Sequence, residues 1–174
     1  MEFVTHERCD LDGIAGIVLL SEFLRDCRKE KVKIYFWDGD REKLKHIHSS
    51  GVSSRVIFVD VAPPKRYSSD LIFDHHNAVD EKEEITATYK VVRYLVKHSG
   101  LRLDNEKGKD NERGQRVKKI ARWTQRADYE GVESETLANL IKRMHLTSSD
   151  QEVFDWAKTA ILAFLKARKV TFEL

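Results

Sequence analysis

Residues 55–61 have the sequence Arg-Val-Ile-Phe-Val-Asp-Val, which is the clearest indication of the fold class. Its central apolar residues are β-branched or aromatic, and they predict a strand that is buried on both faces. Such strands are typical of a parallel sheet covered by helices, in which ligands bind beyond the carboxyl ends of the strands. The acidic residue that follows the run, Asp60, therefore lies where a functional site is expected.

The segments on either side alternate between strand and helix patterns. Short β-branched or apolar runs predict further strands at 2–5, 32–37 and 69–73. Helical spacing of apolar residues predicts helices at 13–28 and 87–98, with a short polar helix at 40–48. This alternation predicts an α/β fold with a mainly parallel sheet flanked by helices.

The C-terminal third has a different character. Residues 104–115 contain no apolar side chain and two glycines, so we expect a solvated loop there. Further helices are expected at 116–127, 133–145 and 149–168, the last with Ser149 and Glu152 as a capping box, and a short strand at 170–174. Nothing marks a domain boundary, so we expect one domain over 1–174 with a helical part at about 116–168.

Composition excludes several classes of protein. The chain has 174 residues, of which 41% are hydrophobic and 34% charged, with a net charge of +2, which excludes a disordered polyelectrolyte. The longest apolar run, 14–20, is far shorter than the roughly 20 residues of a membrane span, so no membrane partner is expected. The N-terminus lacks a signal-peptide pattern and the two cysteines form no CxxC motif, so we expect a cytoplasmic location.

Acidic and imidazole side chains follow three of the predicted strands. These residues are His6, Asp10 and Asp12 after the first strand, Asp60 after the central one, and Asp74, His75 and His76 after the last. Carboxylates that converge at one sheet edge repel one another, so they predict a bound cation. Mixed carboxylate and imidazole ligands without thiolates suit Mn²⁺, with Mg²⁺ as the alternative. The number of acids favours two ions, an arrangement typical of phosphoester hydrolysis.

These motifs resemble a known family. The run His6-xxx-Asp10-x-Asp12-Gly13, the lone Asp60 after an apolar strand and the triplet Asp74-His75-His76 resemble, in order, the first three motifs of the DHH phosphoesterase superfamily. That family includes RecJ-like single-strand exonucleases and oligoribonucleases. The resemblance covers roughly residues 1–130. It implies a Rossmann-like domain and a manganese-dependent phosphoesterase that acts on short single-stranded nucleic acid or a nucleotide.

The resemblance also implies a role for each residue. His6 and Asp10 would hold one ion, Asp12, His75 and Asp128 the other, and Asp60 would bridge both. His76 would contact a phosphate oxygen or the leaving group, and Asp74 would orient the histidines. Asp128 is the candidate for the fourth motif of the family, with Asp104 and Asp110 as alternatives.

Relatives in this family usually carry a second domain that closes on the substrate. The 174 residues leave little room for one. We therefore expect the substrate site to be completed by this domain alone, by a second copy of the chain, or by a partner chain. The alternative function is a catalytically inactive relative that binds nucleic acid or acts as a scaffold.

A basic stripe is predicted on the helix that leads to Asp128. It consists of Arg116, Lys119, Arg122 and Arg126, which recur at helical spacing. The stripe could follow a phosphodiester backbone toward the metals, or it could be a solvated helix face.

Several other residues are expected to have structural roles. We expect Trp123 to face the core rather than a base, and the threonines Thr86 and Thr88 to cap the helix at 87–98 rather than to meet a ligand. Cys9 is expected to be a small loop residue and not a ligand. The remaining histidines are expected to be solvated: His46, His48, His98 and His145.

Overall fold

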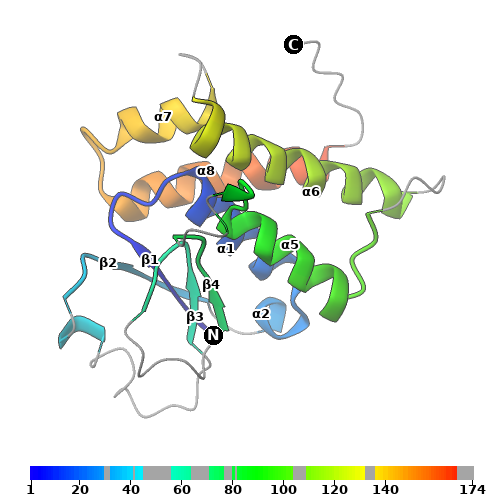
Figure 1. Ribbon diagram of the computed structural model, residues 1–174, viewed down its shortest axis with the longest axis horizontal. Helices are drawn as coiled ribbons and strands as arrows, with labels where there is room; N and C mark the ends of the chain where they lie inside the picture. The colour runs from blue at the N-terminus through cyan, green and yellow to red at the C-terminus, as the bar shows by residue number, and fades with distance from the viewer. Residues whose placement is uncertain are drawn as a thin grey trace.

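A computed structural model describes residues 1–29, 32–40, 42–44, 56–63, 71–76, 80, 82–103, 109–131 and 136–167. Its centre is a parallel sheet with the strand order β2-β1-β3-β4 (Figure 1). The strands are β1 (Glu2–His6), β2 (Lys33–Trp37), β3 (Val56–Val59) and β4 (Leu71–Phe73). All three pairings are parallel, which confirms the predicted α/β class.

Helix α1 (Leu11–Phe23) is the centre of the hydrophobic core. Residues 11–20 are all buried, and α1 contacts β1 and β3 on one side and α5, α6, α7 and α8 on the others. The helix predicted at 13–28 starts two residues earlier, at Leu11. Asp10 is its N-cap and accepts hydrogen bonds from the N–H groups of Asp12 and Gly13. The helix also breaks at Leu24, where the backbone is extended, before the short helix α2 (Arg25–Lys29).

Two glycines allow α1 to approach the sheet closely. A Cβ on Gly13 would lie 2.6 Å from Cys9 Sγ and 2.8 Å from Thr5 Oγ1, and one on Gly16 would lie 2.6 Å from Val59 Cγ1. Side chains larger than hydrogen would push the helix outward at both positions. The glycines therefore set the height of the α1 N-terminus above the ends of β1 and β3.

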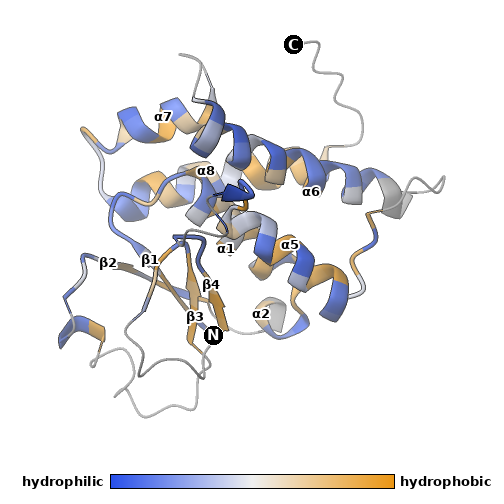
Figure 2. Cartoon of the chain, in the orientation of Figure 1, coloured by the Kyte–Doolittle hydropathy of each residue, from blue (hydrophilic) through white to orange (hydrophobic). Residues whose placement is uncertain are grey.

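The remaining helices cover α1 and one face of the sheet. They are α5 (Ala87–His98), α6 (Lys109–Gln125), the π-helical segment η2 (Arg126–Glu130), α7 (Leu137–Met144) and α8 (Asp150–Lys166). Figure 1 shows α6 and α7 farther from the sheet than α1, whereas α8 also reaches the sheet, where Phe154 packs edge-on against Phe36 of β2 at 6.3 Å between ring centroids. Figure 2 shows hydrophobic residues along β3 and β4 and mixed stripes on the outer helices. Within the described ranges every helix is too short or too polar to cross a lipid bilayer.

Most predicted elements agree with the structure. The helix at 87–98 is confirmed, with Thr86 as its N-cap, and so is the capping box of Ser149 and Glu152. The predicted helix at 133–145 is α7, which begins at Leu137. Of the helix predicted at 40–48, residues 42–44 are helical and residue 40 is not. Residues 41 and 45–48, which include His46 and His48, lie outside the described residues, as does the strand predicted at 170–174.

The loop predicted at 104–115 is wrong for its second half, because α6 begins at Lys109. Tertiary contacts explain the helix. A Cβ on Gly114 would lie 2.1 Å from the carbonyl oxygen of Arg102, so this glycine permits close packing rather than a turn. Arg113 pairs with Glu22 of α1 and lies 4.3 Å from the Phe23 ring centroid. Asp110 therefore belongs to a helix, and Asp104 lies outside the described residues.

We predict that Gly16→Ala destabilises the protein by about 1–2 kcal/mol. Overpacking a core costs about 1–3 kcal/mol, and a contact of 2.6 Å belongs in the upper half of that range, while the higher helix propensity of alanine offsets about 1 kcal/mol. The β-branched Val59 side chain, 2.6 Å from the added Cβ, cannot easily turn away. Urea denaturation measures the change. The penalty should shrink in a Val59→Ala background, and an unchanged or higher stability of Gly16→Ala would contradict this packing.

Candidate metal centre

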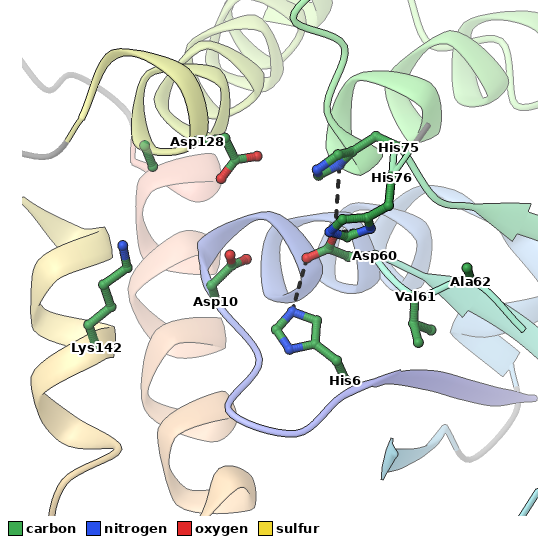
Figure 3. Close-up of a pocket in the computed structure, with 10 residues that line it drawn as sticks. His6, Asp10, Asp60, Val61, Ala62, His75, His76, Asp128 and Lys142 are labelled. Atoms are coloured by element: carbon green, nitrogen blue, oxygen red, sulfur yellow. Dashed lines mark hydrogen bonds and ion pairs between the residues drawn. The ribbon is translucent and has the colours of Figure 1, made fainter. Parts of the chain in front are cut away.

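A pocket of about 560 Å³ opens at the carboxyl edge of the sheet (Figure 3). His6 ends β1, Asp60 directly follows β3, and Asp74, His75 and His76 directly follow β4. The pocket is lined by His6, Asp10, Asp60, Val61, Ala62, His75, His76, Ala127, Asp128 and Lys142. Side chains from all three strand ends thus meet around one cavity, although Asp12 and Asp74 are not among the residues that line it.

Three groups of side chains in this region could hold a metal ion. Each group has ligand atoms within 4.8 Å of one another, and the groups are His6–Asp10–Asp60, Asp12–His75–Asp128 and Asp60–His75–His76. Asp60 and His75 each belong to two groups. The groups are therefore continuous with one another and form one cluster.

Asp60 lies at the centre of the cluster. It is 2% exposed, its Oδ2 is 3.1 Å from His6 Nε2, and its Oδ1 is 3.6 Å from His75 Nδ1. Within the described part of the chain, Oδ1 is buried without any hydrogen-bond donor. Asp60 has φ of +57°, while its N–H donates to the carbonyl of Phe73. A non-glycine residue held in this left-handed conformation, with an unsatisfied buried carboxylate oxygen, is typical of a functional position.

The carboxylates of Asp10 and Asp12 are fixed at the starts of two helices. Asp10 Oδ1 accepts hydrogen bonds from the first turn of α1, at 2.8 Å from Asp12 N and 3.3 Å from Gly13 N. Asp12 accepts from the first turn of α5, at 2.6 Å from Ala87 N and 2.9 Å from Thr88 N. Helix N-termini favour negative charge, so both carboxylates are held in place and partly stabilised as anions.

His6 and His76 are each oriented by a neighbouring oxygen atom. His6 Nδ1 lies 2.7 Å from the carbonyl of Glu7, so Nδ1 donates and Nε2 faces Asp60. His76 Nδ1 lies 2.6 Å from Asp74 Oδ1, and its ring stacks on His75 at 4.4 Å between centroids. A histidine whose second nitrogen donates to an oxygen is the usual geometry of a metal ligand.

Asp128 reaches the cluster from η2. The hydroxyl of the next residue, Tyr129, donates to the carbonyl of Ile85, and Thr124 lies 3.2 Å from the Thr86 hydroxyl. These contacts anchor η2 against the start of α5, beside Asp12. The structure thus brings Asp128 to His75 and Asp12, whereas Asp110 lies in α6.

The pKa values show a shortage of positive charge. Burial and the charges of Asp60 and Asp12 raise the pKa of Asp10 to about 6. Burial of its carboxyl group and the charges of Asp12, Asp10 and Asp60 raise the pKa of Asp128 to about 8. Burial opposes ionisation of Asp12 too, but hydrogen bonds from His75 and Thr88 lower its pKa below the usual value.

The imidazoles respond to the same acids. Burial alone would lower the pKa of His6, but the hydrogen bond and charge of Asp60 outweigh it and raise that pKa to about 9. The pKa of His75 is also raised to about 9, because the hydrogen bond and charge of Asp12 outweigh burial. Together with the unsatisfied Oδ1 of Asp60, these shifts fit a site built for divalent cations.

Residues near the cluster include one buried thiol. The thiol of Cys9 lies 3.2 Å from Thr5 Oγ1, and burial raises its pKa well above the ordinary value. A protonated thiol that faces the core is a poor metal ligand. The donor set therefore consists of carboxylates and imidazoles.

The basic stripe does not line the pocket. Arg116 is half-buried and donates to the carbonyl of Leu165, a contact that the sequence interpretation did not include. Arg126 pairs with Glu130 at 3.0 Å, and Lys119 and Arg122 are exposed. Trp123 packs against Phe164 at 4.6 Å between ring centroids, which confirms its predicted structural role.

The sequence analysis did not predict the positions of Lys142 in α7 and of His145 in the turn that follows it. Lys142 lines the pocket. The expectation that His145 is solvated is wrong, because its side chain is 7% exposed and Nε2 lies 3.0 Å from the carbonyl of Cys9. Asp150 accepts from the N–H of Arg8 at 3.0 Å in the same loop. No local pattern links these residues to the first motif, since the contacts join segments more than 130 residues apart.

Comparisons with protein-family models, with curated proteins and with solved structures found no match for this chain. The functional interpretation therefore rests on the geometry of its own residues.

We predict that the metal-free protein loses stability as pH rises from about 4 to about 9. The folded-state pKa values of Asp10, Asp128, His6 and His75 are all raised, so the native state binds more protons than the unfolded chain. The stabilisation is complete below the unfolded pKa of each group and is lost as pH passes its folded pKa. Urea denaturation in EDTA at several pH values measures this, and Asp128→Asn should flatten the slope between pH 4 and 8. A stability that rises over this range would contradict the charge shortage.

We also predict that Mn²⁺ stabilises the protein. A cation that binds only the folded state at 100 times its Kd contributes about 2.7 kcal/mol. Thermal unfolding with and without Mn²⁺ measures the effect, which should be largely lost in Asp60→Asn. The exposed Asp155→Asn on α8 is the matched control and should retain it. An equal Mn²⁺ effect in Asp60→Asn and in the unaltered protein would exclude Asp60 as a ligand.

Proposed function

We propose that this protein is a two-metal-ion phosphoesterase, with Mn²⁺ as the preferred metal and Mg²⁺ as the alternative. The position of Asp60 carries the proposal. One of its oxygens faces His6 and the other faces His75, and these histidines belong to the two outer ligand groups. A carboxylate between two sets of ligands is the arrangement that a pair of neighbouring ions requires.

The residues divide between the two ions as follows. His6 and Asp10 would hold one ion, and Asp12, His75 and Asp128 the other, with Asp60 shared. Oxygen and imidazole donors without thiolate favour Mn²⁺ over Zn²⁺. The bound ions would supply an activated water at neutral pH and neutralise charge on the phosphoryl group.

His76 and Asp74 would act on the substrate side of the pocket. Nδ1 of His76 donates a hydrogen bond of 2.6 Å to Asp74 Oδ1. The other nitrogen of this exposed ring, Nε2, is therefore the one that would contact the substrate. There it would hold a phosphate oxygen or give a proton to the leaving-group oxygen. The Asp74 segment is itself held by Lys90, whose ammonium group donates to the Asp74 carbonyl and pairs with Asp80.

The substrate class that we propose is a phosphodiester of short single-stranded nucleic acid or of a nucleotide. A pocket of about 560 Å³ is within the range of small-ligand sites. Of the basic stripe, the exposed Lys119 and Arg122 remain for a longer nucleic-acid backbone. Because the His76 side chain is 56% exposed, a second copy or a partner chain could cover the pocket, as relatives with two domains cover theirs.

We predict that the protein hydrolyses bis-(p-nitrophenyl) phosphate and a short oligonucleotide in the presence of Mn²⁺. Asp60→Asn should reduce kcat/KM by more than about 100-fold, because it removes the shared ligand. Asp74→Asn should reduce it by about 10- to 100-fold, the usual effect of a residue that orients a functional histidine. Asp155→Asn is again the control.

Two results would contradict the proposed function. If no phosphoester is hydrolysed and no Mn²⁺ is bound at equilibrium, the alternative function is favoured, that of a catalytically inactive protein that binds nucleic acid or acts as a scaffold. If Asp60→Asn retains full activity, hydrolysis does not occur at this cluster.

A further inference from the structure

The wall of the pocket contains one lysine, Lys142 of α7. Among the residues that line the pocket in the described structure, it alone has a permanent positive charge. Asp10 and Asp128 line the same pocket, yet the ammonium group of Lys142 forms no ion pair or hydrogen bond with any described side chain. Its ammonium group is therefore not used to neutralise the cluster.

The position of Lys142 gives the pocket two different ends. In Figure 3 the ammonium group lies on the side of Asp10 and Asp128, while Val61 and Ala62 lie beyond His6 and His76 on the other side. A ligand that crosses the cluster would thus meet a cation at one end and small apolar side chains at the other. This asymmetry suits an ester with a further anionic group on one side of the reacting phosphate.

Charge balance supports an anion beside Lys142. The cluster contains four carboxylates, those of Asp10, Asp12, Asp60 and Asp128. Two divalent ions would balance these four charges, so the carboxylates would not need the ammonium group of Lys142. That group is then available to an anionic group of the substrate.

We propose that Lys142 binds a second, non-reacting phosphate of the substrate. This inference rests on the proposed function and makes it more specific: the preferred substrates carry a phosphate next to the phosphodiester that is cleaved. Lysine suits this role as a compact point charge on a flexible stem, which can follow a phosphate whose position differs between substrates.

Thymidine dinucleotides test the proposal. TpT contains one phosphate, whereas pTpT and TpTp carry a second one at either end. We expect the unaltered protein with Mn²⁺ to cleave pTpT or TpTp with a kcat/KM roughly 10- to 100-fold above that for TpT, the range of a hydrogen bond to a charged group. Lys142→Ala should remove this preference, mainly through KM, and Lys142→Arg should retain most of it.

Arg143→Ala is the matched control. It removes the same charge from the adjacent, exposed position of α7, outside the pocket lining, and should leave the preference unchanged. Thermal unfolding checks that the Lys142 variants remain folded, which we expect because Lys142 is exposed. An absence of preference in the unaltered protein, or a preference that survives Lys142→Ala, overturns the proposal.

A binding measurement separates this inference from the proposed function. Calorimetry of pTpT, TpTp and TpT is repeated with Ca²⁺ in place of Mn²⁺. If no dinucleotide is hydrolysed, the phosphoesterase proposal fails. The role of Lys142 still stands if tighter binding of the doubly phosphorylated ligand is lost in Lys142→Ala alone, and it fails if the affinities do not differ.

Discussion

Carboxylates crowded at the carboxyl edge of the sheet repel one another, and several elements of the fold are arranged to offset this repulsion. Four acidic side chains belong to groups whose ligand atoms lie within 4.8 Å of one another. The fold compensates with the N-termini of α1 and α5 and with the imidazoles of His6 and His75. The raised pKa values of Asp10 and Asp128 show that this compensation is incomplete. The proposed metal ions would supply the missing positive charge, which links the stability of the fold to its chemistry.

Helix α1 joins the core to the cluster. Its buried apolar residues form much of the core, and its first turn carries Asp12 directly after the capping Asp10. Because Gly13 and Gly16 have no side chain, α1 lies close enough to β1 and β3 for these acids to approach Asp60. The same packing that stabilises the domain therefore sets the geometry of the candidate metal centre.

The helical part of the chain completes the pocket from the other side. The turn between α7 and α8 holds the loop before Asp10 through His145 and Asp150. Segment η2 brings Asp128 to the cluster, and α7 brings Lys142 to the pocket wall. In the described structure, residues that follow the sheet in sequence thus supply both an acid of the cluster and the proposed phosphate-binding cation.

Local patterns in the chain were sufficient for the parallel sheet and for the acids and histidines at its edge, because a polar residue after a buried strand is placed by that strand alone. They were insufficient wherever two distant segments meet. The polar start of α6 is helical through contacts of Arg113 and Gly114 with other elements, and His145 is buried by a loop more than 130 residues away. The approach of Asp128 to Asp12 and His75, and the presence of Lys142 in the pocket, likewise follow from how η2 and α7 pack. Hydrophobic periodicity defines the buried face of each helix, but only tertiary packing decides which exposed residues share a cavity.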